Sequence, residues 1–119
     1  MARGDPLDGQ VLRLAAAKAS VPPRRLPRLV DRAQAHLGPK LDEYRRRYER
    51  VVEEDDRAVF LAERGQWARI GEKLGLGERE VDALRRAHEE QLRRSGTVED
   101  RREEFESALE VREAVVVGT

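Results

Sequence analysis

The segment from Trp67 to Leu84, WARIGEKLGLGEREVDAL, constrains the fold of this chain more than any other. Its small and apolar residues have the spacing of two helices joined by a tight turn, the helix-turn-helix motif. Gly71 falls where the second helix passes too close for a larger side chain, and Gly75 opens the turn. The residues that we expect to form the core of this motif are Trp67, Ile70, Gly71, Leu74, Gly75, Leu76, Val81 and Leu84. An ordinary helical hairpin is the alternative interpretation of the same spacing.

Length and composition favour a helical protein. The 119 residues suffice for one domain, 1–119, with a single modest core. Aromatic residues make up only 4% of the chain and charged residues 40%, so the core must consist mainly of Leu, Val, Ile and Ala. We therefore predict an all-α fold, a compact bundle of about five to six helices, with the helix-turn-helix at residues 67–94.

Turn residues divide the first half of the chain into helices. A first helix is predicted from the pair Asp5-Pro6 to about Ala19, in which Leu7, Val11, Leu14 and Lys18 follow one another at helical spacing. A second helix follows the turn at residues 20–23, and Pro27 lies in its first turn, where the missing N–H costs little. Its inner face is formed by Leu26, Leu29, Val30, Ala33 and Leu37.

Residues 39–64 allow two helical interpretations. After Gly38-Pro39 a long third helix is predicted, with an apolar stripe of Leu41, Tyr44, Tyr48, Val51 and Val52. That helix either reaches Arg64 or breaks in the acidic run 53–56, where an aspartate caps a new helix that begins at Arg57. We favour a kink or short break, because residues 59–61 are consecutive apolar residues and cannot all share the earlier stripe.

The C-terminal part is predicted to hold one more helix. The second helix of the motif should end at Ser95-Gly96, since glycine commonly terminates helices. Thr97 then caps the last helix, whose inner face comprises Val98, Phe105, Ala108 and Leu109. The β-branched run Val115–Val117 either completes that helix or forms a short extended tail.

The two halves of the chain carry opposite charge. Residues 1–50 hold 12 Lys and Arg against 6 Asp and Glu, whereas residues 51–119 hold 12 against 18. A basic half of this kind provides a face for an anionic partner, or attracts the acidic half of the same or a second chain. The usual origin of such charge runs is solvated helix faces. Basic residues of the first half that could contact DNA are Arg24, Arg25, Arg28, Arg32, Arg45, Arg46 and Arg47.

The sequence contains little that resembles a catalytic, cofactor or metal site. It has no cysteine, and His36 and His88 fall on different predicted helices as partly exposed residues without a ligand partner. The serines lack a nucleophile elbow, and the glycines of the motif do not follow a strand. No signal peptide or membrane span is recognisable. We therefore expect a non-enzymatic cytoplasmic protein with no metal, no cofactor, no small-molecule substrate and no membrane partner.

The 67–84 segment resembles the helix-turn-helix superfamily of homeodomain-like and sigma-factor-like DNA readers. In that superfamily the outer face of the second helix enters the major groove. The resemblance implies that the outward positions here are Gly77, Glu78, Arg79, Glu80, Asp82, Ala83, Arg85 and Arg86. Three of these are acids, which DNA phosphates repel, and only Arg79, Arg85 and Arg86 favour DNA.

Two further resemblances concern longer stretches. A tryptophan, an apolar residue three positions on and LGL before an acidic helix start are similar to part of the death-fold interaction domains, which are six-helix bundles that bind each other through charged faces. The C-terminal two thirds, with RYERVVEEDDRAVFL and DRREEFESALEVREAVVVG, resembles a family of small helical haloarchaeal proteins of unknown function. That family implies a fold and no activity.

Two hypotheses of function follow from these patterns. The first is a regulatory or architectural protein that binds double-stranded DNA, as a homodimer because one motif covers few base pairs. The second is a protein-interaction module, death-fold-like or adaptor-type, that binds no nucleic acid and docks through its acidic C-terminal half or its Arg-rich third helix. The basic half of the chain favours the first hypothesis slightly, whereas the acidic start of the reader helix weighs against it.

Overall fold

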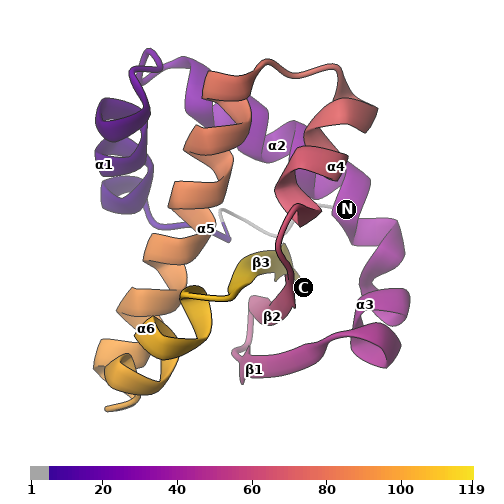
Figure 1. Ribbon diagram of the computed structural model, residues 1–119, viewed down its shortest axis with the longest axis vertical. Helices are drawn as coiled ribbons and strands as arrows, with labels where there is room; N and C mark the ends of the chain where they lie inside the picture. The colour runs from indigo at the N-terminus through magenta and orange to yellow at the C-terminus, as the bar shows by residue number, and fades with distance from the viewer. Residues whose placement is uncertain (1–5) are drawn as a thin grey trace.

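A three-stranded antiparallel sheet and the helices around it make up the computed structural model, which describes residues 6–119 (Figure 1). The sheet has the order β1-β2-β3, so the central strand β2 pairs with both others. In chain order the elements are α1 (Gly9–Ala19), α2 (Arg25–Leu37), the short 3-10 helix η1 (Gly38–Lys40), α3 (Leu41–Arg47), β1 (Glu49–Glu53), β2 (Arg57–Glu63), α4 (Gln66–Leu74), α5 (Glu78–Val98), α6 (Arg102–Leu109) and β3 (Arg112–Gly118).

The sheet shows that the predicted all-α fold is wrong, and that the protein is a mixed α and β structure. Ala58–Ala62 of β2 and Ala114–Val117 of β3 are unbroken buried runs. Successive side chains of a strand point to opposite faces, so an unbroken buried run means that both faces of the sheet are covered. Such a run has neither the alternation of a half-buried strand nor the period of an amphipathic helix, which is why the pattern was ambiguous.

Residues 39–64 form a helix and a β-hairpin instead of one or two long helices. The 3-10 helix η1 leads directly into α3, which ends at Arg47. The next residue, Tyr48, is extended, with φ −122° and ψ 156°. The acidic run that was predicted to kink or cap a helix contains the turn of the hairpin, where the Glu54 N–H donates to the Arg57 carbonyl at 2.8 Å. Val51 and Val52 therefore reach the core from a strand.

The first two helices lie close to their predicted positions. In α2, Pro27 lies in the first turn, and all five residues predicted for its inner face are buried. Helix α1 ends at Ala19 as predicted, but Leu14 is 45% exposed and does not belong to its inner face. The predicted cap at Asp5 lies outside the described residues.

The C-terminal helices differ from the prediction in their bounds. Helix α5 continues past Gly96 to Val98, which is 86% exposed instead of buried. Gly96 therefore lies inside the helix and does not end it. A glycine is needed at this position because α6 packs closely against it: a Cβ atom would be 2.7 Å from Cδ2 of Phe105. Thr97 belongs to α5 and caps no later helix, since α6 begins at Arg102.

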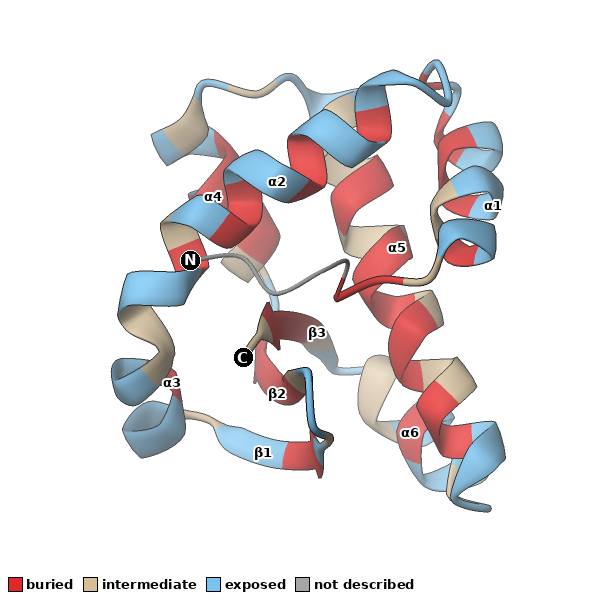
Figure 2. Ribbon diagram, turned by 180° about the vertical axis from the view of Figure 1, so that it is seen from behind, coloured by how far each residue is buried: buried red, intermediate tan, exposed pale blue. Residues whose placement is uncertain are grey.

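Helix α5 is the central helix of the molecule. It contacts α1, α2, α4, α6 and β3, and buried residues follow one another along most of its length (Figure 2). The final valines form β3, so the extended alternative for this segment is correct, although the segment is a paired strand of the sheet and not a tail.

Side chains of three helices close the outer edge of β3. The Gln34 amide of α2 donates to the Val116 carbonyl at 2.7 Å, and Nδ1 of His88 in α5 accepts from the Val116 N–H at 2.8 Å. The indole N–H of Trp67 in α4 donates to the Ala114 carbonyl at 2.9 Å. These side chains provide the hydrogen bonds that a fourth strand would otherwise make.

Candidate functional site

The turn between α4 and α5 brings the two helices into close contact. Gly75 is left-handed, with φ 71°, and the Leu76 N–H donates to the Gly71 carbonyl at 2.9 Å. A Cβ atom on Gly71 would overlap Cγ2 of Val81 on α5. The predictions that Gly75 opens a turn and that Gly71 admits a close second helix are therefore confirmed.

The predicted core positions of this segment are not equally buried. Trp67, Ile70 and Leu84 are at most 2% exposed, and Gly71 is also buried. Leu74, Leu76 and Val81 are only partly buried, and they pack at the edge of the core. Part of the apolar surface of the segment therefore faces solvent.

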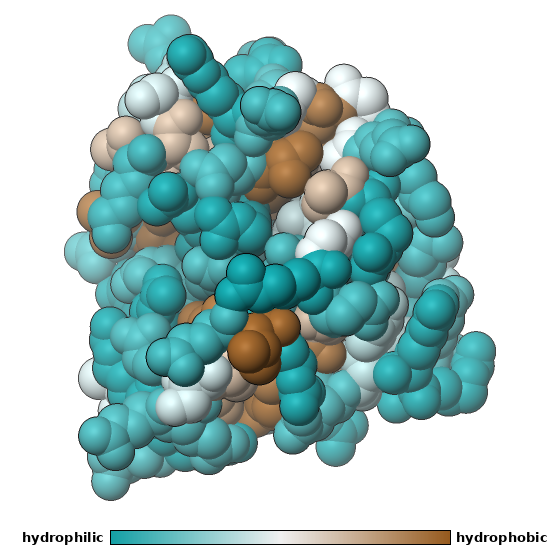
Figure 3. Space-filling model, viewed as in Figure 1, coloured by the Kyte–Doolittle hydropathy of each residue, from teal (hydrophilic) through white to brown (hydrophobic). Residues whose placement is uncertain are grey.

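That partly exposed apolar surface forms a groove between α4 and α5. Ala68, Leu76 and Val81 lie along the groove, which has a volume of about 430 Å³. In Figure 3 hydrophobic atoms gather between the two helices and are surrounded by hydrophilic ones. The sequence pattern did not predict this groove, because it placed Leu76 and Val81 inside the core.

Carboxylates border the groove. Glu72, Glu78 and Asp82 all line it. Within residues 6–119, neither Glu72 nor Glu78 forms an ion pair, whereas Asp82 pairs with two arginines. The two unpaired carboxylates leave the border of the groove negatively charged.

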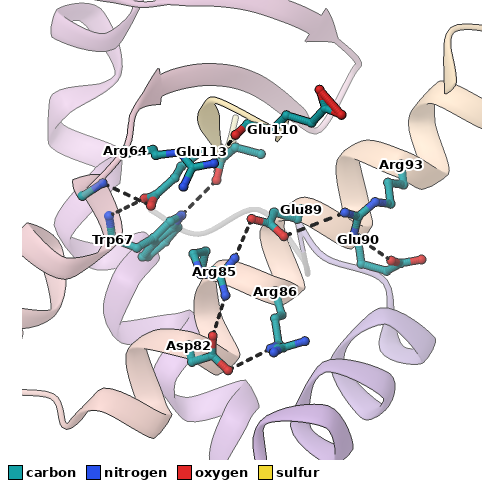
Figure 4. A network of polar contacts seen from close by, with 12 residues as sticks. Arg64, Trp67, Asp82, Arg85, Arg86, Glu89, Glu90, Arg93, Glu110 and Glu113 are labelled. Carbon is teal, nitrogen blue, oxygen red and sulfur yellow. Dashed lines mark hydrogen bonds and ion pairs between the residues drawn. The ribbon is translucent and has the colours of Figure 1, made fainter. Parts of the chain in front are cut away.

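Two arginines of α5, Arg85 and Arg86, bind carboxylates of the same helix (Figure 4). Arg85 donates to Asp82 at 2.6 Å and to Glu89 at 2.8 Å, and Arg86 donates to Asp82 at 2.8 Å. Burial raises the pKa of the Asp82 carboxyl, but the hydrogen bonds from Arg86 and Arg85 outweigh it and hold this pKa below its ordinary value. The positive charges of Arg85 and Arg86 are thus compensated within the helix, whereas Arg79 forms no ion pair with any residue of 6–119.

The predicted outward face of α5 also includes a buried residue. Ala83 is 0% exposed and belongs to the core, so its predicted outward position is wrong. Glu80 accepts from the Gly77 N–H at 3.1 Å and binds the Arg25 guanidinium of α2. The hydrogen bond from the Gly77 N–H is the main cause of the lowered pKa of Glu80, so this carboxylate is negatively charged at neutral pH.

The remaining DNA candidates lie on separate elements. Arg32 of α2 donates to the Leu74 carbonyl at the end of α4, at 2.6 Å. On α3, Arg45 pairs with Glu53 at 3.8 Å and Arg47 with Glu43 at 3.6 Å. The exposed candidates without an ion pair to any residue of 6–119 are Arg24, Arg28, Arg32, Arg46 and Arg79. Helix α2 therefore lies beside the turn between α4 and α5. The arginines Arg45, Arg46 and Arg47 lie on a separate helix, α3.

Sequence reasoning missed two polar residues near Trp67, the buried His88 and the half-buried Glu113. His88, which was expected to be partly exposed, is 0% exposed, and its ring centroid lies 4.3 Å from that of Trp67. Glu113 of β3 accepts from the Gly65 and Trp67 N–H groups at 3.1 and 2.9 Å, and so caps the start of α4 (Figure 4). Neither contact could be inferred from local spacing, because both join residues distant in sequence.

The described part of the chain contains neither a metal-binding cluster nor a membrane-spanning helix. Between residues 6 and 119, no group of three His, Asp or Glu side chains is placed to hold a metal ion. Every helix in this range is too short or too polar to span a lipid bilayer.

Comparison with known proteins identifies a family but no activity. No curated protein and no solved structure matches the chain. The resemblances to homeodomain-like, death-fold and haloarchaeal proteins therefore stay predictions. One family model matches residues 5–119, which is nearly the whole chain. The chain belongs to the family described as Domain of unknown function (DUF8048).

Proposed function

We propose that this protein is a non-enzymatic interaction module that binds a basic amphipathic helix of a partner protein in the groove between α4 and α5. The observation that carries the proposal is the combination of an apolar floor, at Ala68, Leu76 and Val81, with a border of unpaired carboxylates. An amphipathic helix inserts its apolar face into such a groove. Lysines and arginines beside that apolar face would then lie against Glu72 and Glu78.

The charges of α5 favour a protein partner over DNA. A helix that reads the major groove needs positive charge free to reach phosphates. Here Arg85 and Arg86 are held by Asp82 and Glu89, and the first turns of α5 are acidic. A duplex would have to break these ion pairs and approach three carboxylates.

A designed peptide tests the proposal directly. The probe is a labelled helix of about 18 residues with leucines on one face and lysines beside them. We expect saturable binding by fluorescence anisotropy, weakened by added salt because charge attraction contributes. Replacement of Ala68 by Arg should lower the affinity by at least about tenfold, since it fills the groove with a charged side chain. Ala68 is exposed, so the replacement should leave the fold intact.

Matched variants separate the groove from general charge effects. Glu78→Lys should weaken peptide binding, whereas Glu103→Lys should not, although both residues lie in the first turn of a helix. Ala17→Arg on the exposed side of α1 is the control for Ala68→Arg. Equal losses in each variant and its control would contradict the groove as the binding site.

Random duplex DNA is the competing ligand in the same assay. We expect no saturable binding of the duplex at low salt. Tight binding that disappears when Arg45, Arg46 and Arg47 are all changed to Glu would instead support the DNA hypothesis and overturn the proposed function.

A further inference from the structure

A polar pocket lies on the side of α4 that carries Gln66, Arg69 and Lys73. It has a volume of about 210 Å³ and is enclosed by residues of α2, η1, α3 and α4 together with Tyr48 and Glu63. The residues that determine its chemistry are His36, Lys40, Tyr44, Tyr48, Gln66 and Lys73. None of them lines the groove between α4 and α5.

Two lysines of this pocket lack a negative partner. Two other basic residues of the pocket are paired, Arg47 with Glu43 at 3.6 Å and Arg69 with Glu63 at 2.8 Å. Lys40 and Lys73 form no ion pair with any residue of 6–119. The pocket therefore keeps uncompensated positive charge.

The imidazole of His36 is close enough to both lysines to be affected by their charge. Burial lowers the pKa of His36, and the charges of Lys40 and Lys73 lower it further. All three residues line the same pocket. An anion between them would relieve the repulsion of two like charges.

A chain of hydrogen bonds leaves the Tyr44 hydroxyl proton available. Arg69 can only donate, and it donates to Oε1 of Gln66 at 2.8 Å. The Gln66 amide must therefore donate from Nε2, and it does so to the Tyr44 hydroxyl oxygen at 2.7 Å. Within the described residues, the hydroxyl proton of Tyr44 has no acceptor.

Tyr44 is well placed to remain a donor. Its side chain is 2% exposed, and burial raises its pKa to about 12, so the hydroxyl stays protonated at neutral pH. The ring of Tyr48, which is half-buried, lies 4.8 Å from that of Tyr44 and also lines the pocket. The pocket thus combines two cations, a neutral donor and an aromatic ring.

We propose that this pocket binds the phosphate group of a small phosphate monoester. Lys40 and Lys73 would compensate the two negative charges of the phosphate, and the Tyr44 hydroxyl would donate to one of its oxygens. Tyr48 offers a ring against which a planar group, such as a nucleobase, can stack. The site is independent of the proposed groove for a partner helix.

The test uses the full chain at low salt with inorganic pyrophosphate, inorganic phosphate and AMP as separate probes. Isothermal titration should detect saturable binding of pyrophosphate. Tighter binding of AMP than of inorganic phosphate would identify a nucleotide as the source of the phosphate group, and equal binding would identify the free anion. The double variant Lys40→Gln, Lys73→Gln should weaken binding by at least about tenfold.

The only other lysine of the chain provides a matched control. Lys18→Gln removes the same charge from α1, outside this pocket, and should leave the affinity unchanged. Tyr44→Phe should weaken binding several-fold while the two lysines remain, with circular dichroism to confirm that the variant folds. Absence of pyrophosphate binding at low salt, or an equal loss in the Lys18 variant, would overturn the proposal. Binding of duplex DNA without binding of either small probe would also overturn it.

Discussion

The Nδ1 atom of His88 accepts a 2.8 Å hydrogen bond from the backbone N–H of Val116. Because Nδ1 is the acceptor, the ring proton of the neutral imidazole lies on Nε2, which has no hydrogen-bond partner among the described residues. The Trp67 ring lies against the imidazole, tilted by 51° to it. His88 is therefore fixed as a neutral residue by the strand edge that it covers, and protonation of Nδ1 would break that contact.

The first prediction is that stability falls as the pH decreases below about 6.5, the ordinary pKa of His. Burial lowers the pKa of His88 to about 3 in the folded protein, so between these values the unfolded chain binds a proton that the folded chain does not. The stability contributed by this residue is complete above the unfolded pKa and is lost as the pH falls toward the folded pKa. Between pH 8 and pH 5 we expect a loss of about 2 kcal/mol, measured by urea unfolding.

The variant His88→Asn isolates this contribution. Its side-chain oxygen can take the place of Nδ1 as acceptor but does not titrate. We expect the variant to be less stable at pH 8 and to show a shallower pH dependence. His36 is present in both proteins, so its titration contributes equally to both curves. The same dependence of unfolding free energy on pH in the variant and the wild type, between pH 8 and pH 5, would therefore contradict the assignment.

The second prediction concerns Gln34. Its amide donates to the Val116 carbonyl and accepts from the Gly118 N–H at 2.8 Å, so Gln34→Leu leaves two backbone groups of β3 unpaired. We expect a loss of about 2–4 kcal/mol of stability, because each unsatisfied buried group costs about 1–3 kcal/mol. Hydrogen exchange should show faster exchange of the Gly118 amide. Gln10→Leu, at an exposed position of α1, should change stability by less than about 0.5 kcal/mol.

Segments whose secondary structure depends on local periodicity were predictable from the sequence, whereas segments whose structure depends on pairing with distant strands were not. Helix α2 was predictable because its apolar residues repeat with the helical period over its whole length. Residues 41–52 have nearly the same spacing, yet only Leu41–Arg47 is α-helical. Pairing of β1 with β2 and of β2 with β3 decided the outcome, and the period of a single segment carries no information on such pairing.

The candidate site was predictable in part for the same reason. The close approach at Gly71 follows from the short turn, and the pairing of Asp82 with Arg85 and Arg86 follows from spacings of three and four residues in a helix. Such spacings in a helix favour ion pairs within the helix over contacts of either arginine with DNA. The pocket near Lys40 and Lys73 could not be inferred, because it depends on the packing of α2 and α3 against α4.

The third prediction is that Asp82→Asn changes stability little. The side chains of Asp82, Arg85 and Arg86 are 34%, 33% and 41% exposed, and ion pairs of this exposure contribute about 0–1 kcal/mol each. We expect a loss of less than about 1 kcal/mol at pH 7, measured by urea unfolding. The folded pKa of this carboxyl lies below its ordinary value, so the small contribution should be present above pH 4 and lost below it. A loss several times larger would mean that the network orders the helix.

The fourth prediction tests the contact between the two helices of the motif. Gly71→Ala places a methyl group against Val81 and should destabilise the protein by about 1–3 kcal/mol through overpacking. The double variant Gly71→Ala, Val81→Ala removes the opposing methyl groups and should be more stable than the sum of the two single changes predicts. Gly38→Ala is the control, because φ is −51° there and no packing neighbour among residues 6–119 lies within 4 Å of the added Cβ. That change should be neutral or stabilising by about 0.4–1 kcal/mol, and additivity in the double variant would refute direct contact between residues 71 and 81.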